Sequence, residues 1–362
     1  MTNVIILNKA PRRMPLRETL PALVPGFANH RRVREDVFWL KENAELLGIM
    51  AATGITVPSD MLATHQAFYD ELEERLEFYP QYYRFLLSIG LDLEDLGLRG
   101  RKMERLCART ARDKLAEAEL SDLQRAEARR LLARRGVRLG ASMSGLDDRL
   151  REFISRSSTF ALPNKKAAYE LTHIVFYLSE YGARDPDLPF AAVLSLEYAG
   201  LVAFLEQNID LLSEVCVALR HAGFAPNEIW EDSIREYVST AQLDTSEDAS
   251  LNDNYHTYLV AAWAVAVMGA QESGPAIPPG RCAFLAGHTA PGALRSLSTT
   301  LMTLGGARLS DWSKMRDVVL DALPPQDANL LQLAEHSSPA FRGFFEIFAR
   351  APKGNRPRQP LH

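Results

Sequence analysis

The residues best suited to chemistry lie in the segment YELTHIVFYLSEYG, residues 169–182. Four polar side chains follow one another there at spacings of three, four and three, which places them along one stripe of a helix. They are Glu170, His173, Tyr177 and Glu180. The other positions are mostly apolar, so the helix is expected to be central. Because buried polar groups need partners, the stripe should face a polar cavity or a matching stripe.

A second segment, NDNYHTY at residues 252–258, combines the same residue types. Its Asp and His are three apart at the start of a helix whose later face is apolar. Two central helices therefore each carry a carboxylate-x-x-His pair, which is the ligand unit of helical di-iron and di-manganese sites. The predicted metal ligands are Glu170, His173, Asp253 and His256, with iron or zinc as candidate ions.

Helix geometry limits how these residues act together. His173 and Glu180 are two turns apart, about 10 Å along the axis, so they do not easily bind one small ion. A catalytic site with three protein ligands and one open position requires His256 to come from a facing helix. Without a metal, a His–carboxylate pair suits general acid/base catalysis, because a nearby carboxylate raises the pKa of an imidazole. A third interpretation is a pair of core histidines bonded to neighbouring carboxylates or carbonyls.

The pattern YxLTHxxFYxSEYG, residues 169–182, resembles a THxxFYxTDFG-type signature of uncharacterised bacterial proteins that look like (α/α) toroids. The pattern YHTxLV, residues 255–260, is similar to their later YHxTLV segment. The resemblance covers about 20 residues and implies a toroid with His173, Glu180 and His256 around a central cavity. Glu180 stands where that pattern has Asp, so the carboxylate arm is longer here. The predicted catalytic residues are His173, Glu180, Tyr177 and His256.

The hydrophobic pattern predicts an all-α fold. Apolar residues recur three and four apart over residues 31–53, 59–79 and 164–181, and these segments begin or end at capping residues, Pro or Gly. Only residues 4–7 resemble a strand, and residues 242–254 and 271–280 are predicted loops. We expect antiparallel helical hairpins that form an (α/α) toroid-like domain or a multi-helix bundle.

The domain prediction follows from the same pattern. We expect an N-terminal extension over residues 1–14 and a helical part over 15–160. A second helical part over 161–350 carries the candidate site and continues the first part in one domain. Residues 351–362 are predicted to form a disordered tail.

Length, composition and charge exclude several protein classes. The 362 residues are 47% hydrophobic and 24% charged, as in average soluble proteins, which excludes a disordered chain. The three cysteines are far apart and form no CxxC pair, so neither a zinc knuckle nor a disulfide scaffold is expected. We expect no secretory signal, because the N-terminal apolar run has only four residues and precedes the charges, and no apolar run approaches the roughly 20 residues that span a bilayer. We therefore expect a soluble, cytoplasmic protein without a membrane partner.

The net charge of −5 is divided unevenly along the chain. Residues 99–138 carry 13 basic and 6 acidic side chains, whereas residues 185–254 carry 2 basic and 14 acidic ones. We interpret the basic part as solvated helices with i,i+4 ion pairs; the alternative is a docking face for RNA or an acidic partner. No aromatic residue lies within 99–138 to stack on bases, so nucleic acid is not expected as a partner.

Two functions remain at this point. The first is an enzyme of bacterial secondary or peptide metabolism that uses the His173/Glu180/His256 cavity on a small-molecule or peptide substrate, with or without a metal. The second is a non-catalytic helical scaffold whose oppositely charged faces bind a protein partner. An enzyme requires the histidines to converge at a pocket, and a scaffold buries each one separately.

Overall fold

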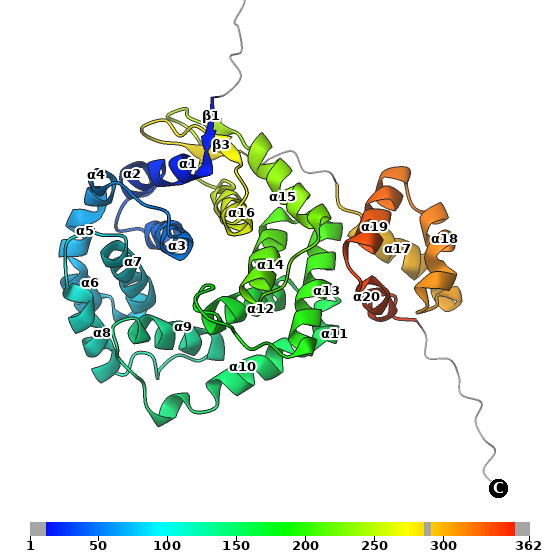
Figure 1. Ribbon diagram of the computed structural model, residues 1–362, viewed down its shortest axis with the longest axis horizontal. Coiled ribbons are helices and arrows are strands. Elements are labelled where there is room, and N and C mark those ends of the chain that lie inside the picture. The colour runs from blue at the N-terminus through cyan, green and yellow to red at the C-terminus, as the bar shows by residue number, and fades with distance from the viewer. Residues whose placement is uncertain (1–11, 286–290, 352–362) are drawn as a thin grey trace, which may run out of the picture. The chain divides into compact units, whose positions relative to one another are not determined.

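The structure, a computed structural model, describes residues 12–285 and 291–351 (Figure 1). Nearly all regular structure in these residues is helical, which confirms the all-α prediction. The chain divides into two compact units, and each combines two stretches of sequence. The first unit comprises residues 1–146 and 233–289, and the second comprises residues 147–232 and 290–362. Residues 4–7 and 352–362 lie outside the described residues. Whether the helices form one domain and close into a toroid stays a prediction.

The first unit consists of short and medium helices with two very small sheets. Its elements are β1 (Arg13–Pro15), α1 (Leu16–Ala22), α2 (Val24–Gly26), the π-helix η1 (Phe27–Arg31), α3 (Val37–Thr53), α4 (Ser59–Leu62), η2 (Ala63–His65), α5 (Gln66–Asp70), α6 (Leu72–Phe78), η3 (Pro80–Tyr82), α7 (Tyr83–Asp95), α8 (Lys102–Arg112), α9 (Asp122–Ala133), η4 (Ala141–Met143), β2 (Leu243–Asp244), α16 (Tyr255–Met268), β3 (Ser273–Pro275) and β4 (Ala283–Phe284). Helix α15 (Glu228–Thr240) passes from the second unit into the first.

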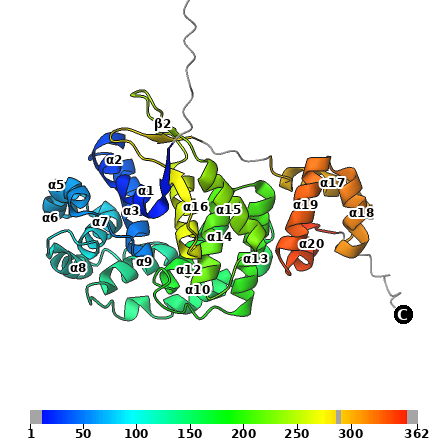
Figure 2. The same ribbon diagram turned by 45° about the horizontal axis from the view of Figure 1, so that its top comes forward.

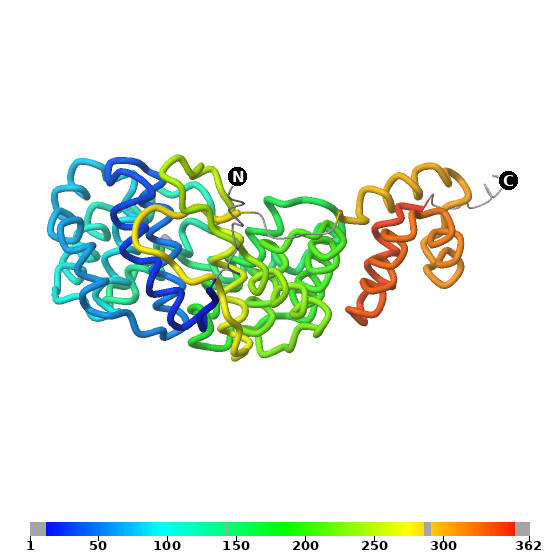
Figure 3. The backbone as a smooth tube through the Cα atoms, turned by 90° about the horizontal axis from the view of Figure 1, so that it is seen from above, coloured from blue at the N-terminus to red at the C-terminus, as the bar shows by residue number. Residues whose placement is uncertain are grey.

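Helix α3 forms the core of the first unit, where it packs against both α7 and α16 (Figure 1; Figure 3 gives the view from above). The Asp36 side chain caps its first turn by accepting a hydrogen bond from the Phe38 amide, and Gly54 ends it with a left-handed φ of 65°. Its buried residues include Leu46, Leu47 and Met50. Each such side chain stabilises the fold by about 1.5–3 kcal/mol through removal of apolar surface from water.

The start of α3 differs from the predicted helix over residues 31–53. The chain is extended at Arg32, and α3 begins only at Val37. Arg31 and Arg32 both form ion pairs with the buried carboxylate of Glu42. In a continuous helix, Arg31 would lie about 16 Å along the axis from Glu42, so these ion pairs require the chain to turn back between them.

The predicted helix over residues 59–79 is also divided, into α4, η2, α5 and α6. A tighter 3₁₀ turn at Ala63–His65 separates the first two α-helical pieces. His65 is fully buried in this turn, and its Nε2 lies 2.8 Å from Oδ1 of Asn43 on α3. The 3₁₀ turn therefore coincides with a contact between His65 and α3, which the spacing of apolar residues does not predict.

The two sheets are pairs of antiparallel strands, with β1 beside β3 and β2 beside β4. Each strand has two or three residues, which is too short for an alternating pattern to appear in the sequence. β2 and β3 lie in the two segments predicted as loops. The β1–β3 pairing ties the stretch that contains α16 to the rest of the first unit, and the β2–β4 pairing lies within that stretch.

The second unit is built around three neighbouring helices, α12, α13 and α14 (Figure 2). Its elements are α10 (Leu146–Ile154), α11 (Ser157–Phe160), α12 (Lys165–Leu178), α13 (Phe190–Glu206), α14 (Ile209–His221), α17 (Leu294–Leu304), η5 (Gly305–Ala307), α18 (Trp312–Ala322), α19 (Pro325–Ser337) and α20 (Phe341–Phe348). Helix α13 is buried along most of its length and also contacts α17, α19 and α20. Within residues 12–285 and 291–351, no helix is long and apolar enough to cross a bilayer.

The arginines of the predicted basic part, on and after α8 and α9, pair mostly with other elements. On α8, Arg105 pairs with Glu73 and Arg109 with Glu77, both on α6. After α9, Arg134 and Arg135 bind acidic residues at the end of α7. The i,i+4 pairing that the sequence suggests is present at Arg109–Asp113. These four arginines therefore join helices of the first unit.

Candidate functional site

Helix α12 positions the predicted polar stripe. Asn164 caps its start by accepting a hydrogen bond from the Ala167 amide. The helix ends at Leu178, and the next residues turn away because Glu180, Tyr181 and Gly182 all adopt left-handed φ values of 50°, 56° and 88°. Glu180 therefore lies beyond the end of α12 and does not continue the stripe that the sequence predicts. Two non-glycine residues in this conformation are unusual and mark a strained turn.

The orientation of His173 is fixed by the backbone of its own helix. Its Nδ1 lies 2.8 Å from the carbonyl oxygen of Tyr169, and since a carbonyl only accepts, Nδ1–H is the donor. In the neutral imidazole the lone pair is then on Nε2. The side chain is 36% exposed. Histidines that bind metals are held in this way, with one nitrogen bonded to a carbonyl and the other facing the ion.

Helix α14 contributes two carboxylates, and one of them lies next to His173. Glu214 is 2% exposed, and its Oε2 lies 3.6 Å from Nδ1 of His173 and accepts a 2.5 Å hydrogen bond from the Thr172 hydroxyl. One turn earlier, Asp210 accepts a 2.7 Å hydrogen bond from the Tyr169 hydroxyl. An oxygen of Asp210 lies within 4.8 Å of one of Glu214. We call these five residues the α12–α14 cluster.

The hydroxyl groups of the cluster act as fixed donors. Burial raises the pKa of Tyr169 far above its ordinary value, and the negative charge and hydrogen bond of Asp210 raise it further. The phenol therefore stays protonated at neutral pH and keeps the Asp210 carboxylate in place. Thr172 holds Glu214 in the same manner. The cluster thus presents two oriented carboxylates and one oriented imidazole.

The other residues of the predicted stripe are placed differently. Tyr177 is buried, and its ring meets the His173 ring edge-on at 6.1 Å between centroids. Glu170 is half-buried and makes no hydrogen bond or ion pair with a described residue. The carboxylate beside His173 is therefore Glu214 of the neighbouring helix, not Glu170 three residues earlier. Sequence reasoning missed Asp210, Glu214 and Tyr169, although an acidic pair four apart inside the apolar stretch 209–219 was a readable signal.

In the first unit, the start of α16 places the second predicted pair. Tyr255 donates a 2.9 Å hydrogen bond to Oε2 of Glu45 on α3, and Nε2 of His256 lies 3.8 Å from Oε1 of the same carboxylate. Burial, followed by the charge of Glu45, raises the pKa of Tyr255 well above its usual range. His256 thus faces a carboxylate on another helix, as His173 does.

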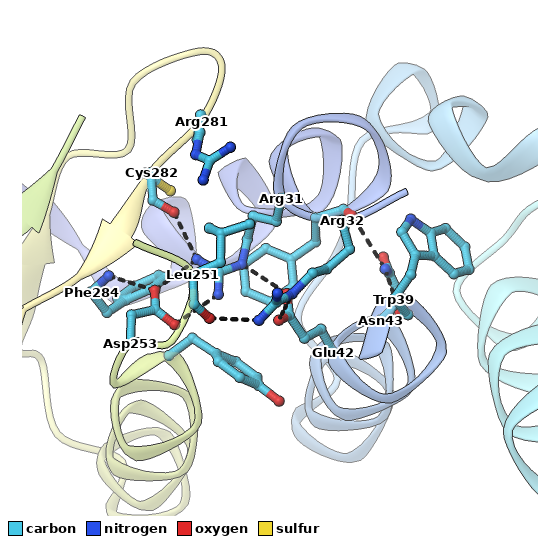
Figure 4. A network of polar contacts seen from close by, with 12 residues as sticks. Arg31, Arg32, Trp39, Glu42, Asn43, Leu251, Asp253, Arg281, Cys282 and Phe284 are labelled. Carbon is cyan, nitrogen blue, oxygen red and sulfur yellow. Dashed lines mark hydrogen bonds and ion pairs between the residues drawn. The ribbon is translucent and has the colours of Figure 1, made fainter. Parts of the chain in front are cut away.

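Asp253 belongs to a buried ion-pair network (Figure 4). Its two carboxylate oxygens accept hydrogen bonds of 2.8 and 2.9 Å from the guanidinium of Arg31, and the Phe284 amide donates to one of them. Arg31 is fully buried and also donates to Glu42 and to the carbonyl of Cys282. Asp253 therefore has a structural role, because its hydrogen bonds join the start of α16 to Arg31 and Phe284.

The charge of Arg31 is stabilised despite its burial. Burial alone lowers the pKa of a guanidinium, but the hydrogen bonds and charges of Asp253 and Glu42 raise the pKa of Arg31 above its ordinary value. The rings of Phe27 and Tyr255 lie 4.9 and 5.1 Å from its central carbon. Arg31 therefore fixes the position from which Tyr255 and His256 project.

The predicted catalytic and metal residues are divided between the two units. His173, Tyr177, Glu170 and Glu180 belong to the second unit, and Asp253 and His256 belong to the first. The predicted convergence of His173 and His256 stays a prediction.

A family model described as a domain of unknown function (DUF6902) matches residues 1–351. The chain belongs to this family. Comparison with curated proteins and with solved structures finds no match. The DUF6902 match extends over both units and both His–carboxylate clusters. Any functional conclusion for this DUF6902 chain must therefore come from the geometry of its residues.

Proposed function

We propose that the protein is an enzyme that acts on a small-molecule or peptide substrate at the α12–α14 cluster, with a divalent ion such as zinc or iron as cofactor. The supporting observations are the hydrogen bond from His173 Nδ1–H to the Tyr169 carbonyl, which leaves the lone pair on Nε2, and the two oriented carboxylates of Asp210 and Glu214 on the neighbouring helix. One imidazole nitrogen and two carboxylate oxygens are a donor set that both zinc and iron accept. The bacterial, metabolic and cytoplasmic assignments stay expectations.

Each residue of the cluster has a role in this proposal. His173, Asp210 and Glu214 hold the ion, and the hydroxyls of Tyr169 and Thr172 keep the carboxylates oriented. The bound ion supplies Lewis-acid activation of a substrate oxygen or of water. We do not include Asp253 as a ligand, because both of its oxygens are bonded to Arg31. Tyr177, Glu180 and His256 keep their predicted catalytic roles as expectations.

Metal content tests the proposal directly. We expect the full-length protein to contain about one equivalent of zinc or iron by mass spectrometry, and the chelator-treated protein to bind Zn²⁺ in calorimetry. His173→Ala and Glu214→Gln each remove a ligand and should weaken Zn²⁺ binding by more than about 100-fold. The metal-loaded protein is then incubated with short peptides and with ester and amide substrates, and product formation should disappear in His173→Ala.

His336→Ala is the matched control. The Nδ1 of His336 makes the same bond to the carbonyl four residues earlier, at 2.6 Å from Gln332, but the side chain is exposed and makes no ion pair with a described residue. This variant should bind Zn²⁺ as the parent does. The proposal is contradicted if the purified protein contains no metal and the folded His173→Ala variant binds Zn²⁺ as tightly as the parent. That result would favour the scaffold with a protein partner.

A further inference from the structure

The turn that follows α12 has an unusual backbone. Helices commonly end with one left-handed residue, usually a glycine, but three successive residues adopt that conformation here, and Glu180 and Tyr181 are not glycines. The Tyr181 amide donates a 2.8 Å hydrogen bond to the carbonyl of Phe176, and the Arg184 side chain donates a 2.7 Å hydrogen bond to the carbonyl of Leu178. These bonds hold the turn against the end of its own helix. Such strain persists only where the surrounding structure fixes it, and it is frequent at functional sites.

The neighbouring helix α14 also fixes this turn. Gly182 lies so close to His221 that a Cβ atom at this position would be 2.5 Å from Nδ1 of the imidazole, so a larger residue would displace the turn or the ring. His221 follows Glu214 by two turns on the same face of α14. The helix that carries the carboxylates of the α12–α14 cluster therefore also supports the turn. Burial lowers the pKa of His221 to about 4, so its ring is uncharged at pH 7.

The strained turn brings the ring of Tyr181 back to α12. Its centroid lies 5.8 Å from that of the Phe176 ring and 6.2 Å from that of the Tyr177 ring. The same two rings lie 5.7 and 6.1 Å from the ring of His173. Ring pairs at these distances attract each other and prefer particular relative orientations. Phe176 and Tyr177 are buried, so packing restricts their movement. Tyr181 is therefore connected to His173 through two restricted rings.

We propose that Tyr181 is a positioning residue for His173. The hydrogen bond from Nδ1–H of His173 to the Tyr169 carbonyl requires the imidazole to keep one orientation. The rings of Phe176 and Tyr177 limit rotation of the imidazole, and Tyr181 limits the movement of these two rings. Without the Tyr181 ring, Nε2 of His173 no longer points in a single direction. The consequence for metal binding rests on the proposed function, whereas the orientation of the imidazole requires no metal.

The orientation of His173 is tested first, in the metal-free, full-length protein. NMR of the protein with isotope-labelled histidine at pH 7.5 shows which ring nitrogen carries the proton, and His173→Ala identifies the signals of His173. The parent should show the Nδ1–H form. Tyr181→Asn removes the ring but keeps the turn, because Asn adopts the left-handed conformation more readily than most residues. It should show a mixture of both tautomers, and Tyr181→Phe should restore the parent signals because it keeps the ring.

Zn²⁺ binding is the second readout. Tyr181→Asn should weaken Zn²⁺ binding by about tenfold in calorimetry, at the lower end of the range for residues that orient metal ligands. Tyr181→Phe should bind Zn²⁺ as the parent does. Tyr79→Asn is the matched control, because Tyr79 is an exposed tyrosine of the first unit whose ring also contacts two others, those of Phe78 and Tyr82. It should leave both the His173 signals and the Zn²⁺ affinity unchanged.

The inference is overturned if the folded Tyr181→Asn variant keeps the parent signals of His173. A change in Tyr181→Asn that Tyr181→Phe does not reverse overturns it as well, because the ring would then not be the cause. Altered His173 signals in Tyr181→Asn, together with a parent that binds no Zn²⁺, contradict the metal site and support the positioning role. The two proposals can therefore fail separately.

Discussion

His65 illustrates at the scale of one residue how burial sets a protonation state. Its neighbour Asn43 donates its amide hydrogens to the carbonyls of Phe27 and Trp39, so Oδ1 of Asn43 must accept from Nε2–H of His65. Burial lowers the pKa of His65 to about 4. The imidazole is therefore neutral in the folded protein throughout the physiological range.

This depressed pKa predicts a loss of stability in mild acid. In the unfolded chain His65 is protonated below about pH 6.5, whereas in the folded chain it is protonated only near pH 4. Neutral His65 therefore makes its full contribution to the free energy of unfolding above pH 6.5, and this contribution is lost on acidification. At pH 5 the expected loss is about 2 kcal/mol. Urea unfolding at pH 7.5 and pH 5 measures it. In His65→Gln the difference between the two pH values should shrink by that amount, and an unchanged difference would contradict the assignment.

The hydroxyl groups of the α12–α14 cluster lead to a second prediction at this scale. Tyr169→Phe removes a donor to Asp210 and should weaken Zn²⁺ binding by about 10–100-fold, because the carboxylate loses a hydrogen bond that orients it. Calorimetry measures the change. Tyr83→Phe removes a comparable 2.8 Å hydrogen bond to Glu119 in the first unit and is the control. Equal Zn²⁺ affinity in the two variants would argue against a positioning role for Tyr169.

At the scale of elements, the sequence predicts what is encoded locally. Asn164 starts helix α12 in both the prediction and the structure, because capping depends on neighbouring residues. The helix ends at Leu178, before the stop that was predicted at Gly182. The partner of His173 could not be predicted by spacing along α12, since Glu214 comes from the next helix. The break in the predicted helix between Arg31 and Val37 was missed for the same reason, because it accompanies an ion pair between Arg31 and Glu42 that helical spacing does not predict.

The buried Arg31 network gives the prediction for this scale. Arg31→Met leaves Glu42 and Asp253 as buried carboxylates without their cation, and should destabilise the protein by about 3–5 kcal/mol. Arg156→Met removes an exposed ion pair with Glu152 and should cost less than about 1 kcal/mol. Urea unfolding compares the two variants. A similar small cost in both would show that the network does not hold the start of α16.

At the scale of the whole molecule, the two units are interleaved in sequence. The first unit is completed only by residues 233–289 and the second only by residues 290–362. Residues 233–289 supply Asp253 to Arg31, Tyr255 to Glu45 and strand β3 to β1. Helical periodicity predicted the helices but not this exchange of segments, because it depends on contacts between residues more than 200 positions apart.

Truncation tests this interleaving. A chain that ends at residue 232 removes the partners of Arg31, Glu45 and β1, and α3 loses the apolar face of α16. We expect hydrogen exchange of the α3 amides to approach that of an unfolded chain, because the buried charge of Arg31 and the exposed apolar surface both favour unfolding. A chain that ends at residue 289 keeps the whole first unit and should retain the protection of α3, while α13 loses its contacts with α17, α19 and α20. Protected α3 amides in the shorter chain would mean that residues 16–146 hold this helix without the later segment.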